Sequence, residues 1–386
     1  MKRSSFFFLL ALYGALVFAF SPSGISSPSL ITRYPYLQNM TSHSVLIAWR
    51  TLRPVVGGVD LSAISPDTHL QKGRFYEPTG IRTQEPRAST HHAILLSHLL
   101  PATTYRYQID ADSQALTGWI KFKTFPEGSD ASFSFAVVGD SGTGNSYQKK
   151  IAHEMYLVHP DFVIHTGDVI YGGKDDADFD SKFFSIYRAS VERIPWFLSL
   201  GNHDAALDHG IPYLRNFYLP QNSPGKGRYY SFDCAQGHFV ALDSNESMSP
   251  ESEQYRWLKE DLKHSMAPFK VIFFHHPLYS TGFHGSSTRL REVLEPLFRR
   301  YHVTLVLNGH DHDYERSVPI HGITYVVTGG GGGTLYPAME SSWTAHSELD
   351  YNFVYCEVSG TKVHLRATNE DGKIFDEADV PVNSGI

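Results

Sequence analysis

The stretch Val163-Ile164-His165-Thr166-Gly167-Asp168-Val169-Ile170-Tyr171 passes from a short apolar run directly into polar residues. Four other segments repeat this order, and their polar clusters are Gly139-Asp140-Ser141-Gly142, Gly201-Asn202-His203-Asp204, His275-His276-Pro277 and Gly309-His310-Asp311-His312. Short apolar runs of this kind predict buried strands. In open α/β sheets, functional sites form where the carboxyl ends of strands meet. The sequence therefore predicts one site built from five strand ends.

The second half of the chain alternates strand-like with helix-like segments, which predicts a layered α/β (α+β) domain. Strands are expected at 133–138, 162–165, 196–200, 271–274 and 303–307. Helices are expected at 146–158, 253–264 and 288–300, the last with Pro296 inside it. From residue 324 onward the sequence looks richer in strands.

The pattern of residues 28–125 differs from that of the second half and predicts short strands separated by turns. Residues 126–130 are expected to form a linker. Strand-like runs at 44–49, 92–96, 104–109 and 118–125 have no helical period between them, which predicts an all-β sandwich. The segment from Leu99 to Tyr107 resembles the corner of fibronectin type III domains, where a tyrosine bonds to upstream backbone. Tyr105 or Tyr107 is expected in that role.

The composition is that of an ordinary globular protein and narrows the function. The 386 residues include 33 basic and 40 acidic side chains, a formal net charge of −7. A non-specific nucleic-acid binder is expected to show a basic excess, so no nucleic-acid binding is expected. Two cysteines, Cys234 and Cys356, exclude a disulfide-dense scaffold and a four-cysteine zinc site.

The first 19 residues have the pattern of a secretory signal peptide. Lys2 and Arg3 precede an apolar run from Phe6 to Phe18, and small residues near Ala19 suit cleavage. The run is shorter than the roughly 20 residues that a spanning helix needs, although an uncleaved anchor is the alternative. We therefore expect a secreted or periplasmic protein with no membrane span after cleavage. Export would let a disulfide persist, and the sequence leaves open whether the cysteines pair or are two buried free thiols.

The residue types in the five clusters suit a pair of metal ions. Two cations held close together need a shared anionic ligand and separate terminal ligands. Asp140 and Asp168 supply hard anionic oxygens, the histidines supply imidazole nitrogens and Asn202 supplies a neutral carbonyl oxygen. His310 and His312 are two residues apart, which puts both on one face of an extended segment or divides them between neighbouring metals in a loop.

In these five clusters and their order, the sequence resembles the calcineurin-like metallophosphoesterases and, among them, the purple acid phosphatases. The ordered blocks of that family are Asp-x-Gly, Gly-Asp-x-x-Tyr, Gly-Asn-His-Asp/Glu, Val-x-x-His and Gly-His-x-His. They fall on Asp140, Asp168 with Tyr171, Asn202 with His203, His275, and His310 with His312. One block differs from the family pattern, because Ile272 stands in place of the valine of Val-x-x-His. Isoleucine is equally β-branched and also suits a buried strand. His275 is preferred to His276 because the family places the ligand two residues before the proline.

The resemblance implies a fold and a ligand set. The fold is a four-layer metallophosphoesterase β-sandwich flanked by helices, over residues 131–386, preceded by a fibronectin-like domain. One metal would be held by Asp140, Asp168, Tyr171 and His312. The other would be held by Asp168, Asn202, His275 and His310, with Asp168 bridging. A phenolate suits Fe(III) at the Tyr171 site, and the second ion would be Fe, Zn or Mn.

The resemblance also implies outer histidines and a reaction. His203 and His284 would bind phosphate oxygens and protonate the leaving alkoxide, although His284 is alternatively a solvated loop residue. The expected reaction is hydrolysis of small-molecule phosphate monoesters by attack of a metal-bound hydroxide. One alternative is a phosphodiesterase or nucleotidase with the same site. Another is a secreted binding protein with an inactive enzyme-like domain, against which the intact ligand set argues.

Overall fold

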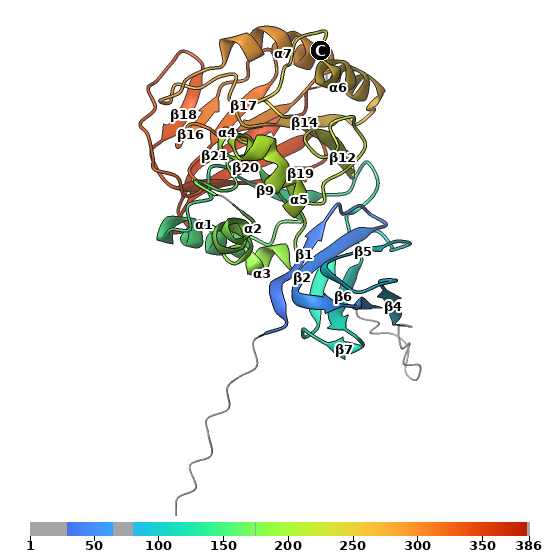
Figure 1. The fold of residues 1–386 in the computed structure, drawn as a ribbon. Coiled ribbons are helices and arrows are strands. Elements are labelled where there is room, and N and C mark those ends of the chain that lie inside the picture. The colour runs from blue at the N-terminus through green and yellow to red at the C-terminus, as the bar shows by residue number, and fades with distance from the viewer. Residues whose placement is uncertain (1–28, 65–79, 174, 384–386) are drawn as a thin grey trace, which may run out of the picture.

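The computed structural model describes residues 29–64, 80–173 and 175–383. The predicted signal peptide, residues 1–19, lies outside this range, so export stays a prediction. An all-β region lies below a larger body of sheets and helices (Figure 1). None of the helices in the described residues is long and apolar enough to cross a membrane.

The first sheet of the larger body has six strands. In spatial order they are β11 (Trp196–Leu198), β10 (Phe162–His165), β9 (Phe133–Val138), β19 (Asn352–Ser359), β20 (Lys362–Asn369) and β21 (Ile374–Pro381). β9, β10 and β11 are parallel neighbours, whereas β19 to β21 run antiparallel. The last segment of the chain therefore completes a sheet that the strands following the linker begin.

The second sheet has seven strands. In spatial order they are β12 (Tyr230–Cys234), β13 (Gly237–Ala241), β14 (Phe269–Phe273), β15 (Leu305–Asn308), β17 (Thr324–Thr328), β16 (Tyr314–Ser317) and β18 (Thr344–Glu348). The central four, β13, β14, β15 and β17, are parallel. The predicted strands agree with both sheets to within a few residues, and the expected β-rich end of the chain is confirmed.

The two sheets pack face to face through aromatic side chains. Phe135 of β9 and Phe162 of β10 both contact Phe239 of β13, with ring centroids 5.4 and 5.1 Å apart and the rings nearly perpendicular. Edge-to-face pairs at this spacing are a favourable aromatic geometry. The outer face of the second sheet carries a separate apolar cluster that includes Leu258 and Phe298 of two helices. The layers are helix, sheet, sheet and helix, as predicted.

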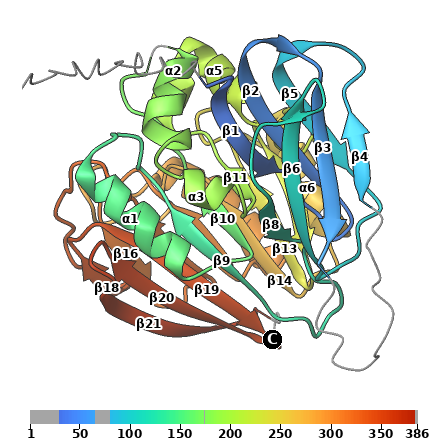
Figure 2. The same cartoon turned by 90° about the horizontal axis from the view of Figure 1, so that it is seen from below.

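The helices cover the outer faces of the sheets or lie in the connections between strands (Figure 2). They are α1 (Ser146–Leu157), α2 (Asp176–Phe179), the π-helix Asp180–Phe184, α3 (Arg188–Val191), α4 (Asn202–Ala206), the 3₁₀ turn Asp208–Gly210, α5 (Ile211–Asn216), α6 (Glu253–His264) and α7 (Thr288–Arg300). α1 contacts β19 of the first sheet and buries Ile151 and Met155. α6 starts where the Ser252 side chain accepts a hydrogen bond from the Tyr255 amide, an N-cap.

The all-β region contains two small sheets. One consists of β1 (Ile31–Gln38), β2 (Val45–Val55) and β5 (Ser89–Leu96). The other consists of β4 (Ile81–Gln84), β3 (Gly57–Ala63), β6 (Thr104–Ala111), β7 (Gln114–Ala115) and β8 (Ile120–Lys123). Tyr105 makes the corner contact, because its hydroxyl accepts the Leu100 amide at 2.9 Å. Tyr107 instead donates to the Glu192 carbonyl in the larger body, at 2.8 Å.

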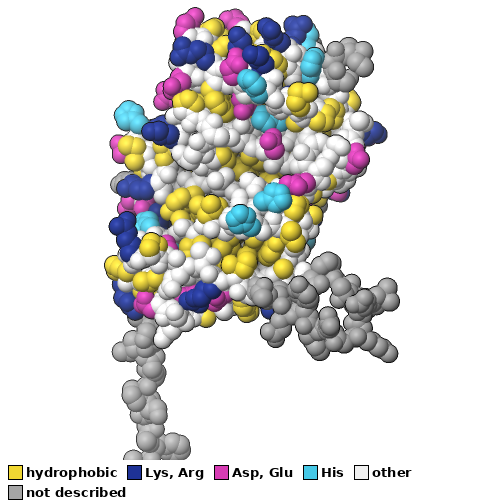
Figure 3. All heavy atoms as spheres, turned by 90° about the vertical axis from the view of Figure 1, so that its right-hand side faces the viewer, with side chains coloured by type: hydrophobic (Ala, Val, Ile, Leu, Met, Phe, Trp, Pro, Cys, Tyr) yellow, Lys and Arg dark blue, Asp and Glu magenta, His cyan; other side chains and the backbone are white. Residues whose placement is uncertain are grey.

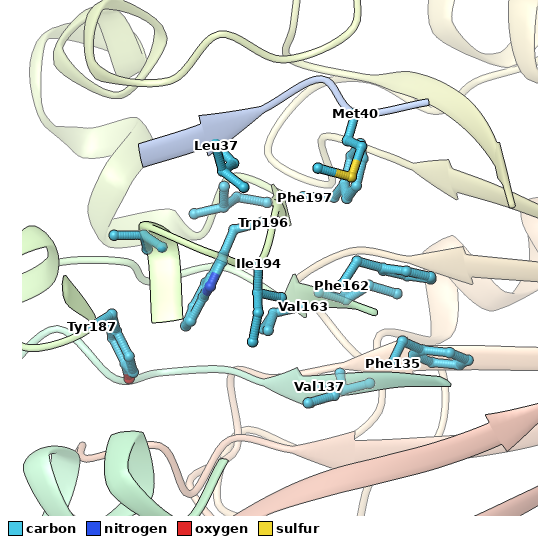
Figure 4. Close-up of a cluster of buried hydrophobic side chains, with 14 of the residues drawn as sticks. Leu37, Met40, Phe135, Val137, Phe162, Val163, Tyr187, Ile194, Trp196 and Phe197 are labelled. Carbon is cyan, nitrogen blue, oxygen red and sulfur yellow. The ribbon is translucent and has the colours of Figure 1, made fainter. Parts of the chain in front are cut away.

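The all-β region is fixed to the larger body by apolar and charged contacts. Leu37 and Met40, at the end of β1, lie over Trp196 and Phe197 of β11 (Figure 4). The fully buried Arg33 pairs with Asp180 at 2.5 Å. Further along the same contact surface, Arg50 Nη1 donates to Asp176 Oδ2 at 2.9 Å and Arg50 Nη2 donates to Asn216 Oδ1, also at 2.9 Å. The two regions therefore share one continuous core.

The two cysteines do not pair with each other, because they lie in different sheets. Cys234 ends β12 of the second sheet and Cys356 lies in β19 of the first, and both are buried free thiols. Burial raises the pKa of each thiol well above its ordinary value, so neither is activated.

The molecular surface mixes side-chain types. On the face seen in Figure 3, Lys and Arg side chains lie mostly along the upper and left margins, hydrophobic side chains lie across the middle and lower part, and histidine side chains are scattered over the face.

Candidate metal centre

The five predicted strand ends meet at one edge of the two sheets. β9, β10 and β11 are parallel and in register, with His165 opposite both Val138 and Leu198, so the segments that follow them emerge side by side. These segments carry Asp140, Asp168 and Asn202. In the facing sheet, β14 and β15 are parallel neighbours, and His275 and His310 follow them. The site lies where the carboxyl ends of strands from both sheets meet.

Three of these residues have left-handed backbone. The φ angles are 55° at Asp140, 55° at Asp168 and 72° at His310, values that non-glycine residues adopt rarely and at an energetic cost. The neighbouring glycines leave room for them. A Cβ on Gly201 would lie 2.0 Å from Asp168 Oδ1, and one on Gly309 would lie 2.2 Å from Asp140 Oδ2. The turn after each strand is thus shaped to bring polar groups together.

Asp140, Tyr171 and His312 form one group of contacts. The Tyr171 hydroxyl donates to Asp140 Oδ1 at 3.1 Å and lies 2.9 Å from His312 Nε2. His312 Nδ1 is 2.7 Å from the Thr334 carbonyl, which can only accept, so Nδ1 carries a proton and Nε2 presents its lone pair to the site. A carbonyl that fixes the tautomer in this way is typical of metal-binding histidines.

His275, Asn202, His310 and Asp168 form a second group. His275 Nε2 lies 2.9 Å from Asn202 Oδ1, 3.2 Å from His310 Nδ1 and 3.5 Å from Asp168 Oδ2. His275 Nδ1 contacts the Thr166 carbonyl at 3.0 Å and is therefore protonated, so in the neutral ring Nε2 is an acceptor that faces other acceptors. Lone pairs that converge in this way need a cation between them, and the donor set fits a metal ion.

The pKa values follow from the same arrangement. Burial lowers the pKa of His275, but the Asp168 and Asp140 carboxylates outweigh burial and raise that pKa to about 9. Burial and the neighbouring His275 lower the pKa of His310 to about 2, which keeps its ring neutral. Burial, reinforced by Asp140, raises the pKa of Tyr171 well above its ordinary value, so the phenol keeps its proton until a cation displaces it. Metals bind ligands in their neutral or deprotonated form, so a cation bound here would displace a proton from both His275 and Tyr171.

Both groups open onto a cavity of about 390 Å³. Its lining includes Asp168, Tyr171, Asn202, His310 and His312 of the predicted ligand set, and also His203 and His284. Asp140 and His275 lie beneath them and are fully buried. The structure thus brings all nine predicted site residues together. Their roles as ligands and catalysts stay predictions.

His203 and His284 reach the cavity in different ways. His203 lies in α4, its amide donates to Asp168 Oδ1 at 2.9 Å, and its side chain is half exposed. His284 lies in an exposed loop, with its ring stacked on His310 at a centroid distance of 4.2 Å. His276, the neighbour of His275, instead bonds the Ser244 hydroxyl at 2.7 Å.

Two residues that support the site were not predicted from the sequence. The buried Asp204 carboxylate accepts the amides of Gly201, Val169 and Ile170, and so ties the turn after β11 to the turn after β10. Burial and the nearby Asp168 raise its pKa to about 7. The sequence feature that could have identified Asp204 is its place in the cluster Gly201-Asn202-His203-Asp204. Tyr336, which stacks on His312 with a centroid distance of 4.6 Å, carried no such signal.

A family model described as "Calcineurin-like phosphoesterase" matches residues 133–314. This span contains every one of the five strand ends described above. Residues 133–314 therefore form a calcineurin-like phosphoesterase domain, and the family predicted from the sequence is confirmed at this level.

The chain is also similar to known purple acid phosphatases. The chain is 30% identical over 297 residues to "Purple acid phosphatase 15" of Arabidopsis thaliana, covering 64% of this chain and 55% of that protein. It is 26% identical over 337 residues to "Fe(3+)-Zn(2+) purple acid phosphatase 12" of the same plant, covering 80% and 69%. The chain thus spans little more than half of the first of these relatives.

A solved structure shows the same fold. The purple acid phosphatase from yellow lupin (Lupinus luteus) seeds superposes with a TM-score of 0.77 at 18% identity, covering 90% of this chain and 74% of that one. Because the alignment extends through most of the chain, the predicted fold class is confirmed: a β-rich region precedes a mixed α/β phosphoesterase domain.

Proposed function

We propose that this chain is a metal-dependent phosphoric ester hydrolase that acts on phosphate monoesters. The observation that carries the proposal is the convergence of seven donor side chains, delivered by five strand ends of two sheets, on one cavity of about 390 Å³. Similarity to purple acid phosphatases supports the reaction class. The complete set of donors argues against an inactive, binding-only domain.

Two metal ions would be held by the two groups of contacts. Asp140, Tyr171 and His312 would hold one ion, and Asn202, His275 and His310 would hold the other. Asp168 would serve both. Carboxylate and phenolate oxygens are hard donors, which suit Fe(III) at the Tyr171 site, and the second ion would be Fe, Zn or Mn. When bound, the pair would neutralise phosphate oxygens and supply an activated water.

The side chains of the cavity wall would handle the rest of the substrate. The half-exposed ring of His203, whose Nε2 lies 3.9 Å from Asp168 Oδ2, would donate a proton to the ester oxygen of the departing alcohol. His284 would bind a phosphate oxygen or share this proton transfer. Tyr336 and Thr334 close the cavity beside His312 and would limit the access of water.

The proposal is tested by metal analysis combined with an assay. As-purified protein is analysed for metals, and its visible spectrum is recorded. Hydrolysis of an aryl phosphate monoester and the matching diester is then measured before and after chelation, and again after metal is restored. We expect faster monoester hydrolysis, lost on chelation and recovered with metal. Faster diester hydrolysis would favour a phosphodiesterase, and no hydrolysis at full metal content would favour a binding protein.

A further inference from the structure

A buried carboxylate holds the loop that carries His284. Asp311 Oδ1 accepts the His284 amide at 2.6 Å. Its other oxygen, Oδ2, accepts the Ser280 hydroxyl at 2.5 Å and the Gly285 amide at 3.2 Å. Asp311 is completely buried. Three donors from one loop therefore converge on a single carboxylate, and hydrogen bonds to a charged acceptor are roughly twice as strong as neutral ones.

The loop from Ser280 to Ser286 is built closely around this carboxylate. A Cβ on Gly282 would lie 2.5 Å from Asp311 Cγ, so only glycine fits there. Gly285 has a φ of 72°, a left-handed conformation that glycine adopts freely. Ser286 closes the loop, because its hydroxyl accepts the Ser280 amide at 3.0 Å and donates to the Ser280 carbonyl at 3.0 Å. The shape of the loop thus depends on Asp311.

The ring of His284 is otherwise lightly held. Among the described residues its nitrogens make no hydrogen bond. The ring stacks on His310 and contacts Phe283 and Tyr336 edge-on, at centroid distances of 5.1 and 5.8 Å. The backbone anchor at Asp311 is therefore the main polar contact that sets where the imidazole lies in the cavity. A ring with unpaired nitrogens, fixed by its backbone, is arranged to bind a ligand.

We propose that Asp311 is a positioning residue for His284 in the reaction proposed above, on which this inference rests. Asp311 lies between His310 and His312, the two histidines predicted to hold different metals. One short segment would thus deliver two imidazoles to the metals and anchor a third histidine beside them. Asp311 acts through the loop and does not touch substrate itself.

A double-mutant cycle tests this role. Asp311→Ala should lower kcat for an alkyl phosphate by about 10–100-fold, the usual effect of losing such a supporting group. In a His284→Ala background the same substitution should lower kcat by less than about threefold, because the residue it positions is gone. Activities are normalised to bound metal. Equal losses in both backgrounds would overturn the proposal.

The matched control is Glu315→Gln. Glu315 is a buried carboxylate that holds the same loop one residue after Ser280, accepting the Thr281 amide at 2.6 Å and the Thr281 hydroxyl at 2.9 Å. It does not contact His284. Its effect should therefore be the same whether or not His284 is present. If the Glu315 cycle were as strongly non-additive as the Asp311 cycle, both substitutions would act by loosening the whole loop. That result would overturn the specific role of Asp311.

A second measurement needs neither metal nor turnover. In the metal-free protein, hydrogen exchange of the His284 and Gly285 amides should be faster in Asp311→Ala than in the wild type. Asp311→Asn, which keeps one acceptor oxygen, should lie between them in both exchange and kcat. Unchanged exchange would overturn the anchor. A wild type inactive at full metal content would overturn the proposed function itself, whereas an active wild type with an additive cycle would overturn only the role of Asp311.

Discussion

Replacing Asp168 by Asn should change both metal binding and the pH dependence of stability. Asp168 is almost fully buried, and its Oδ2 lies 3.5 Å from His275 Nε2. Burial lowers the pKa of His275, but Asp168, followed by Asp140, raises it to about 9. Relative to an ordinary value of 6.5, this rise is equivalent to about 3 kcal/mol of stability in the metal-free protein.

The sign of the pH effect follows from this coupling. A histidine whose pKa is raised in the folded state stabilises the protein fully below its ordinary pKa, and the contribution is lost as the pH rises through about 9. Asp204 acts in the same direction, because burial and Asp168 raise its pKa to about 7, so its ionisation at higher pH repels Asp168. Asp168→Asn should therefore destabilise metal-free protein by up to about 3 kcal/mol at pH 6 and by far less at pH 9.5.

Urea unfolding of chelator-treated protein at both pH values measures this difference. Asp180→Asn is a suitable control, because Asp180 pairs with Arg33, whose guanidinium stays charged at both pH values, rather than with a histidine. In as-purified protein, Asp168→Asn should also lose at least one metal and nearly all hydrolysis while remaining folded. A destabilisation independent of pH would refute the coupling to His275. Near-wild-type activity with two bound metals would refute the assignment of Asp168 as the shared ligand.

Other predictions concern single side chains. Tyr171→Phe should abolish a broad visible absorption band while keeping part of the activity, since only one oxygen is removed; a colourless, iron-free and fully active wild type would contradict the Fe(III) assignment. His203→Ala should keep both metals and lower kcat by about 10²–10⁴-fold, with the smallest loss for phenolic leaving groups; equal losses for aryl and alkyl phosphates would leave only a role in binding. Reductant should leave the melting temperature unchanged, and Cys234 and Cys356 should react with a thiol reagent only after unfolding, because both are buried and unpaired; reaction in the native protein would contradict this burial.

Local pattern was enough to predict much of the catalytic domain. The expected strands at 133–138 and 162–165 coincide with β9 and β10, and the expected helix at 253–264 coincides with α6. These segments have strong signals, because a strand buried on both faces must be apolar throughout and a surface helix shows its own period. Polar residues at the strand ends could be recognised for the same reason, since they interrupt an apolar run that the core requires.

The sequence by itself determined which elements form and which residue types lie at their ends. Tertiary structure alone decided which of them meet: that Tyr105 and not Tyr107 makes the corner contact, that Cys234 and Cys356 lie in different sheets, and that Asp311 anchors the loop of His284. These outcomes depend on pairings between distant segments, such as β19 inserted beside β9 and β17 between β15 and β16. Local periodicity records whether a residue is buried, but the partner against which it is buried is set by the order in which strands pack, which no local pattern encodes.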